Sequence, residues 1–295
     1  MAIFRIVIIL TALALSMALI AIVPASEEVI FKDRFQPVDK PPLPKLPPIT
    51  QITGRAFKGP FRPGTAITLT PLNDDLLQLA PSYRGDVINH QGDYRISALI
   101  PQGLIMAEAN GHFLNELTNE ASPSAIRLEA ITQAQSEIHI HPLTHLETQR
   151  VRTLIADGLT FEAAKAQALD ELITLLGFAS TTSTNTPQDI TPGDTIPGDT
   201  IPVDTIPVDS TQIDLDTPGG DALLTLSAIL VTTPDGQPRT AEAMQVWLTT
   251  LREDLADGQI SPDQQSALVQ SAVGALSTAQ TINTHLAAVI TGTPQ

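Results

Sequence analysis

The sequence predicts an α+β protein of two modules, an antiparallel Greek-key β-sandwich followed by a helical bundle that a disordered linker interrupts. Three observations predict it. Short alternating strand patterns fill the first half of the chain, and amphipathic helix patterns fill the second. An acidic, proline-containing repeat separates the helical segments. The stretch 138–178 joins the modules, because it begins as a strand and continues as helix.

Composition sets the first limits on function. The 295 residues leave room for about two domains. A net charge of -16 argues against a nucleic-acid partner, because phosphate binding requires a basic surface. The chain has no cysteine, which excludes disulfides, thiolate metal sites, thiol nucleophiles and a cysteine-linked lipid anchor.

The first 25 residues form a signal peptide or a membrane anchor. Residues 6–23 are uncharged and apolar, and Arg5 precedes them. Val23-Pro24-Ala25 fits the small-residue rule for signal peptidase, whereas the length of the apolar run approaches that of a membrane span. Both fates stay open, and both place the rest of the chain outside the cytoplasm, in the periplasm or at the cell surface. A membrane contact is expected only through residues 6–23, if they are not cleaved.

Residues 26–50 are a proline-rich linker, and the β-sandwich is expected over 51–141. Its strand patterns are separated by turn residues such as Asn73-Asp74-Asp75 and Asn110-Gly111, which is typical of an antiparallel sandwich. The strand patterns are Ala66 to Thr70, Tyr94 to Ile96, Leu104 to Ala109 and Ile126 to Ile131.

This part of the chain resembles the carboxypeptidase regulatory-like domain, a transthyretin-like seven-stranded Greek-key sandwich. The resemblance rests on Thr53-Gly54-Arg55-Ala56, on Gly64 to Leu69, on Asn89 to Ile96 and on Gly103 to Gly111. Asn89 stands where the family has an acidic residue, and His112-Phe113 replaces its last aromatic position. The resemblance implies an accessory, non-catalytic domain that serves as a spacer, folding aid or binding module on exported proteins. With the helices that follow, the chain is also similar to uncharacterised bacterial exported proteins.

A helical hairpin is predicted over 142–178. A helix over 143–157 ends at Gly158, and Thr160 caps a second helix that ends near Gly177. Glu147 and Arg150 are expected to pair outside the apolar face. Four leucines are expected to be buried: Leu146, Leu154, Leu169 and Leu172.

Residues 179–220 are predicted to be a solvated linker, and residues 221–291 complete the bundle. From Asp189 the linker repeats as DITPG, DTIPG, DTIPV, DTIPV and DSTQI, and its prolines exclude regular helix. Calcium binding by the repeat is less favoured, because no D-x-D-x-D-G loop occurs. The stretch 221–231 is predicted to be a buried central helix, and Thr240 and Ser261 are predicted to cap two further helices.

His139, His141 and His145 are the candidate metal ligands. Two histidines at i and i+2 on a strand, with a third nearby, are a known zinc geometry. The alternative is an ordinary polar face, since Ile138 and Ile140 take the inward positions. We expect His139 and His141 not to be buried together.

Other acidic groups give weaker indications. Asp254 and Asp257 resemble the end of a calcium loop, but a helix end followed by a new cap explains them equally. Glu108, Glu116 and Glu120 are the carboxylates that a glycoside hydrolase would use.

The predicted function is therefore a non-enzymatic exported envelope or surface protein, a structural or binding module for a protein or polysaccharide partner. No cofactor is predicted. Nucleophile motifs such as G-x-S-x-G, S-x-x-K and H-E-x-x-H are missing from the sequence. A zinc-binding exported protein that uses the three histidines is the alternative, and an uncharacterised hydrolase is the third possibility.

Overall fold

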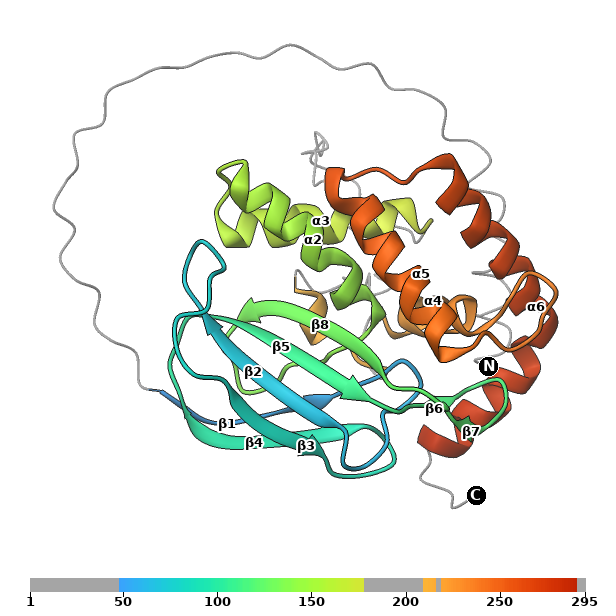
Figure 1. The fold of residues 1–295 in the computed structure, drawn as a ribbon, viewed down its shortest axis with the longest axis horizontal. Helices are drawn as coiled ribbons and strands as arrows, with labels where there is room; N and C mark the ends of the chain where they lie inside the picture. Colours follow the sequence, from blue (N-terminus) through green and yellow to red (C-terminus); the bar gives the residue numbers. More distant parts are fainter. Residues whose placement is uncertain (1–47, 178–208, 216–218, 291–295) are drawn as a thin grey trace, which may run out of the picture.

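The computed structural model describes residues 48–177, 209–215 and 219–290 as a curled antiparallel sheet with helices gathered on one side of it (Figure 1). The α+β class is thereby confirmed. The predicted signal or anchor, most of the proline-rich linker and most of the repeat linker lie outside the described residues. Within the described ranges, no helix combines the length and the apolarity needed to cross a bilayer.

Six strands form one sheet in the order β1–β4–β3–β2–β5–β8, and β6 pairs with β7 in a separate hairpin. The bounds are β1 Ile49–Arg55, β2 Ala66–Leu72, β3 Tyr83–Val87, β4 Asp93–Ile100, β5 Leu104–Gly111, β6 Leu114–Asn115, β7 Glu120–Ala121 and β8 Ile126–Gln133. The sequence analysis did not predict β3. This strand contains Gly85, and a Cβ there would lie 2.6 Å from the carbonyl oxygen of Arg95 on β4, so the close pairing requires glycine.

Side-chain alternation decides which face of the sheet is buried. On β4, Tyr94 and Ile96 are buried, and Arg95 and Ser97 are exposed. β8 differs because both of its faces are buried from Leu128 to Thr132. Two helices, α2 (Pro142–Ala156) and α5 (Ala241–Asp254), pack against β8, so that this strand lies between the sheet interior and the helices.

The segment 136–140, between β8 and α2, runs parallel to β1 and covers its free edge. The amide of Ile138 donates to Thr53 O and that of Ile140 to Arg55 O, both at 2.9 Å. A Cβ at Gly54 would lie 1.7 Å from the carbonyl oxygen of Ile138, so only glycine permits this approach. The prediction that the stretch 138–178 begins as part of the sheet is therefore correct.

The helices are α2 Pro142–Ala156, α3 Phe161–Leu175, α4 Gly220–Val231, α5 Ala241–Asp254 and α6 Pro262–Ile290, with short 3-10 turns η2 Ser210–Gln212 and η3 Leu255–Asp257. The αα-hairpin is present: Gly158 at φ +97° follows α2, and the Thr160 hydroxyl caps α3. The four predicted leucines are all buried. The predicted pair of Glu147 with Arg150 is wrong, because Glu147 is buried against Lys165 of α3.

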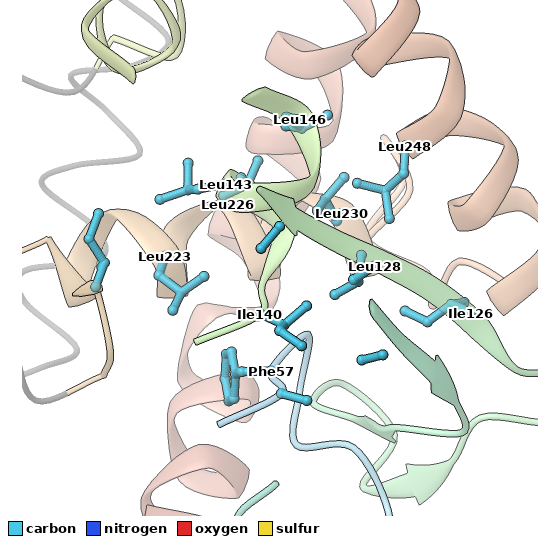
Figure 2. Close-up of a cluster of buried hydrophobic side chains, with 14 of the residues drawn as sticks. Phe57, Ile126, Leu128, Ile140, Leu143, Leu146, Leu223, Leu226, Leu230 and Leu248 are labelled. Carbon is cyan, nitrogen blue, oxygen red and sulfur yellow. The ribbon is translucent and has the colours of Figure 1, made fainter. Parts of the chain in front are cut away.

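One continuous buried cluster contains residues of both the sheet and the helices. As predicted, α4 is the most enclosed helix, and every residue from Ala222 to Val231 is buried. Figure 2 shows Leu223, Leu226 and Leu230 of α4 among side chains from β8, α2 and α5. The two predicted modules therefore share one core.

The end of the predicted linker is part of this core. Ser210, Thr211 and Ile213 have no exposed surface. The expectation of a solvated linker is therefore wrong for residues 209–215. The physical reason is that the last repeat, DSTQI, carries hydroxyl and amide groups in place of Ile and Pro, and these groups hydrogen-bond inside the protein.

Candidate interaction site

The loop between β2 and β3 presents two leucines to solvent. We name residues 73–80 the interaction loop. Leu77 is 64% exposed and Leu79 is 67% exposed. The loop is internally bonded: Asn73 N donates to Leu77 O (2.9 Å), the Asn73 side chain accepts from Leu77 N (2.8 Å), and Leu79 N donates to Pro71 O (2.9 Å). The exposed leucines are therefore held by a defined backbone.

Leu76 anchors the interaction loop in a strained conformation. Its φ is +58°, which is unfavourable for a residue with a Cβ, and it is buried in a small cluster with Leu72, Leu104 and Ile131. A left-handed leucine costs on the order of 1–3 kcal/mol and persists only where its surroundings fix it. Such strain concentrates at binding and switch regions. Here it turns Leu77 and Leu79 outward while Leu76 stays inside.

Leu99 lies at the same end of the sheet and is 69% exposed. β2 and β4 are both antiparallel to β3, so β2 and β4 end where β3 begins. Leu99 near the end of β4 therefore shares this edge with the interaction loop, and Tyr83 at the start of β3 donates its hydroxyl to Leu99 O (3.1 Å). Together, Leu77, Leu79 and Leu99 form what we call the leucine edge. Because these exposed leucines lie at one end of the sheet, this end is the candidate interaction site.

The leucine edge was not among the sites predicted from the sequence. Asn73-Asp74-Asp75 predicts a turn, and the two aspartates are exposed in a loop. The available signal was Leu76-Leu77-Gln78-Leu79 directly after the turn, an apolar run too short for a strand of the core. Which of its leucines is exposed depends on the φ of Leu76, and that angle comes from tertiary packing.

The three histidines are all buried, so the expectation that His139 and His141 are not jointly buried is wrong. They are 7% and 1% exposed, and His145 is 2% exposed. Each Nδ1 accepts a backbone amide: that of Arg55 for His139, of Thr144 for His141 and of Glu129 for His145. The covering segment 209–215, which the sequence analysis placed in solvent, contributes to this burial.

Their hydrogen bonds separate the histidines from one another. His141 is the N-cap of α2, and His145 faces β8 one turn later. Because each Nδ1 is an acceptor, the proton of the neutral ring sits on Nε2, and no lone pair is left for a metal. Among the residues that the structure describes, no group of three or more His, Asp or Glu side chains is arranged to hold a metal ion.

Burial makes the histidines resist protonation. Burial, with a smaller contribution from His139, lowers the pKa of His141 to about 3. Burial, followed by the charges of Arg252 and Arg127, lowers the pKa of His145 to about 3. Below the ordinary histidine pKa of about 6.5, the unfolded chain takes up protons that the folded chain does not. The stability that these groups contribute is therefore present above pH 6.5 and lost as the pH falls toward 3.

We expect His145→Asn to flatten the acid limb of the stability profile, because asparagine keeps an acceptor for the Glu129 amide and does not titrate. Between pH 6.5 and pH 3, the free energy of unfolding should fall by roughly 2–5 kcal/mol more in the wild type than in the variant. Urea unfolding at a series of pH values, followed by the fluorescence of the single Trp247, measures it. Parallel profiles for the variant and the wild type would contradict the claim that His145 stays unprotonated in the folded protein.

A second polar group, a fully buried ion pair, joins the sheet to α4. Lys58 and Glu116 are both without exposed side-chain surface, and Lys58 Nζ donates to the two carboxylate oxygens at 3.3 and 3.2 Å. The Ser227 hydroxyl of α4 donates to the same carboxylate, and its carbonyl accepts from Lys58 (3.2 Å). Burial lowers the pKa of Lys58 and raises that of Glu116. The three groups complete one another's hydrogen bonding.

A third polar group joins α2, α3 and η2. Glu147 pairs with Lys165 and accepts the hydroxyl of Ser210, and Lys165 also donates to Ile131 O (2.9 Å). Burial raises the pKa of Glu147 to about 7. Burial by itself lowers the pKa of Lys165, but the neighbouring carboxylates of Glu147 and Asp209 have the larger combined effect. The pKa of Lys165 therefore lies above its usual value. Glu147 also borders a cavity of about 10 Å³ at the α2–α3 hairpin, which has room for roughly one water molecule.

The remaining candidate carboxylates have other partners or stand apart. Glu116 is the buried partner of Lys58, Glu108 pairs with Arg127 (2.7 Å), and Glu120 is exposed on β7. Asp254 accepts the Ser261 amide (2.7 Å) and Asp257 accepts the Gln259 amide (2.9 Å), so both stabilise the turn between η3 and α6. Sequence reasoning did not single out Lys58 or Lys165, since one lysine beside apolar residues is a weak signal.

No protein-family model, no curated protein and no solved structure matches the chain.

Proposed function

We propose that the protein is an exported, non-enzymatic binding module of a bacterial cell envelope, and that it contacts a protein partner through the leucine edge. The observation that carries the proposal is the interaction loop, in which an internally bonded and strained backbone holds Leu77 and Leu79 outward. Exposed leucine side chains suit the apolar surface of a protein partner better than a polysaccharide, which presents hydroxyl groups. The apolar segment at residues 6–23 supports export.

The chemistry of the buried groups supports a scaffold role for the rest of the molecule. Lys58, Glu116, Lys165, Glu147 and the three histidines bond to one another or to backbone in the core. Catalytic groups need access to a substrate, and these groups instead join the sheet to the helices. We infer that they fix the shape that presents the leucine edge.

The strand order supports the proposed relationship to the carboxypeptidase regulatory-like domain. β2, β3 and β4 follow one another as neighbours, and β1 lies beyond β4, which is the neighbour order of a Greek key. We propose that the sheet is a curled variant of such a sandwich and that the helices form a bundle around α4. This relationship favours an accessory binding role.

Photo-crosslinking in the native envelope tests the proposed function. A photoreactive phenylalanine analogue is placed at position 79 or 99, and matched controls carry it at Val246 or Val273, which are 66% and 53% exposed on α5 and α6. We expect a discrete protein adduct from positions 79 and 99, and none from the controls. The substitution Leu77→Asp should abolish the adduct formed from position 79.

Two results would overturn the proposal. Equal adduct patterns from the leucine edge and from the helix controls would remove the leucine edge as the contact surface. An adduct that glycan hydrolases remove and proteases leave intact would replace the protein partner with a polysaccharide.

A further inference from the structure

The last copy of the acidic repeat lies in the structure as a bound peptide lies in its receptor. We name Asp209–Asp214 the docked segment. It runs beside the segment 136–141 and under the α2–α3 hairpin, and three of its six residues have no exposed surface. Side chains at Asp209, Ser210 and Thr211 bond to residues more than sixty positions away in the sequence.

A cation holds each end of the docked segment. Lys165 Nζ lies 3.4 Å from Asp209, whose other carboxylate oxygen accepts the Thr132 hydroxyl (2.5 Å). Arg55 Nη1 donates to both carboxylate oxygens of Asp214 at 3.1 and 2.9 Å. Because Arg55 belongs to β1 and Lys165 to α3, the fold fixes the distance between the two cations. The groove therefore selects two aspartates five residues apart.

Main-chain bonds hold the middle of the docked segment. His139 N donates to Thr211 O (2.9 Å), and the Gln212 side chain donates to Glu137 O (3.1 Å). His141 Nδ1 accepts from Thr144, so its Nε2 carries the proton and donates to Ser210 O (3.0 Å). Main-chain recognition combined with side-chain pockets is the usual way a protein binds an extended peptide. The ring of His141 and the backbone amide of His139 serve this recognition.

The same spacing occurs in earlier copies of the repeat. The pattern Asp-Ser/Thr-x-x-Val/Ile-Asp stands at 199–204, at 204–209 and at 209–214. The docked copy differs where the groove makes contact. Thr211 Oγ1 accepts from Gln135 (3.1 Å), which the isoleucine of the other copies cannot do. Gln212 N donates to Asp209 O (3.0 Å), and proline at that position has no amide hydrogen.

We propose that this groove is a binding site for an acidic peptide of the form Asp-Ser-Thr-x-Ile-Asp, and that the docked segment of a second copy of the chain can occupy it in place of the chain's own. The two segments have the same sequence, so they make the same contacts. Residues 178–208 connect α3 to the docked segment, and at ~3.3 Å a residue that length of chain can span at most roughly 100 Å. The connection on the other side is short, because α4 begins at Gly220, six positions after Asp214. An exchange between two copies therefore carries α4 and the helices after it along with the docked segment.

Peptide binding to the chain produced without residues 1–25 tests the proposal. The probe is a fluorescein-labelled peptide of sequence VDSTQIDL, corresponding to residues 208–215. The receptor is the Asp209→Asn/Asp214→Asn variant, in which the chain's own segment is weakened. We expect this variant to bind the probe at least 10-fold more tightly than the wild type does. A probe with asparagine at both aspartate positions should bind at least 10-fold more weakly, and VDTIPVDL should also bind more weakly.

Two outcomes would overturn the two parts of the proposal. Equal binding of the aspartate and asparagine probes, or no binding, would overturn the peptide site. If the double variant does not fold, Gln212→Pro provides a receptor whose aspartates are intact. For the second copy, light scattering should detect a dimer whose fraction grows with the concentration of the wild-type chain. A wild-type chain that stays monomeric up to millimolar concentration would overturn the second copy as occupant.

Discussion

Replacement of Lys58 by methionine is expected to lower the free energy of unfolding by roughly 3–5 kcal/mol, the largest effect of any single substitution proposed for this chain. Methionine fills a similar volume but leaves the carboxyl of Glu116 buried without its cation. The Ser227 hydroxyl alone cannot compensate a buried charge. Urea denaturation, with Trp247 fluorescence as the signal, measures the loss.

The matched control removes both charges. Lys58→Met combined with Glu116→Leu should recover most of the lost stability, because breaking a buried pair costs more than replacing it by apolar residues. The Ser227 hydroxyl can then bond within its own helix. A double variant that loses as much as the sum of the two single variants would show that the pair itself, and not the unpaired charge, contributes the stability.

Conversion of the docked segment to the sequence of the preceding repeats should have a comparable effect. Replacing residues 210–213 by Thr-Ile-Pro-Val removes the Thr211 hydroxyl and the Gln212 amide from buried hydrogen bonds. It also places a proline after a residue in a 3-10 turn, a conformation that proline disfavours. We expect a loss of roughly 3–5 kcal/mol, measured by the same urea titration.

The control for this variant tests whether the effect depends on which repeat is changed. The same change made at the start of the repeat, DITPG to DSTQI at residues 189–193, alters residues outside the described structure and should leave the free energy of unfolding within about 0.5 kcal/mol of the wild type. A large effect from the upstream change, or none at 210–213, would mean that the last repeat is not a specific ligand of the groove.

Local signals made the secondary structure predictable. Thr160, Thr240 and Ser261 precede apolar helix patterns, and each hydroxyl accepts the amide three residues on. The alternation around Tyr94 and along Ile126 to Ile131 marked two strands correctly. These features depend on neighbours a few residues apart, so a single sequence contains them.

The site could not be predicted in this way because it depends on distant contacts. His139 and His141 alternate with isoleucines, so one face of the segment was expected to be polar and open. The docked segment, about seventy residues later, covers that face and supplies partners for its polar groups. Glu147 was likewise assigned to a helix surface that Lys165 of the next helix and Ser210 enclose. No local pattern distinguishes a covered polar face from a solvated one.

Hydrogen–deuterium exchange of the wild-type protein, analysed by mass spectrometry, tests the central claim most directly: the last repeat belongs to the fold and completes the scaffold that presents the leucine edge. The amides of Gln212 and Ile213 donate to Asp209 O and Ser210 O at 3.0 Å in a buried segment. We expect a peptide covering 209–215 to exchange as slowly as one from β1, at a rate orders of magnitude below that of an open chain. Exchange at the rate of an unstructured peptide would contradict it.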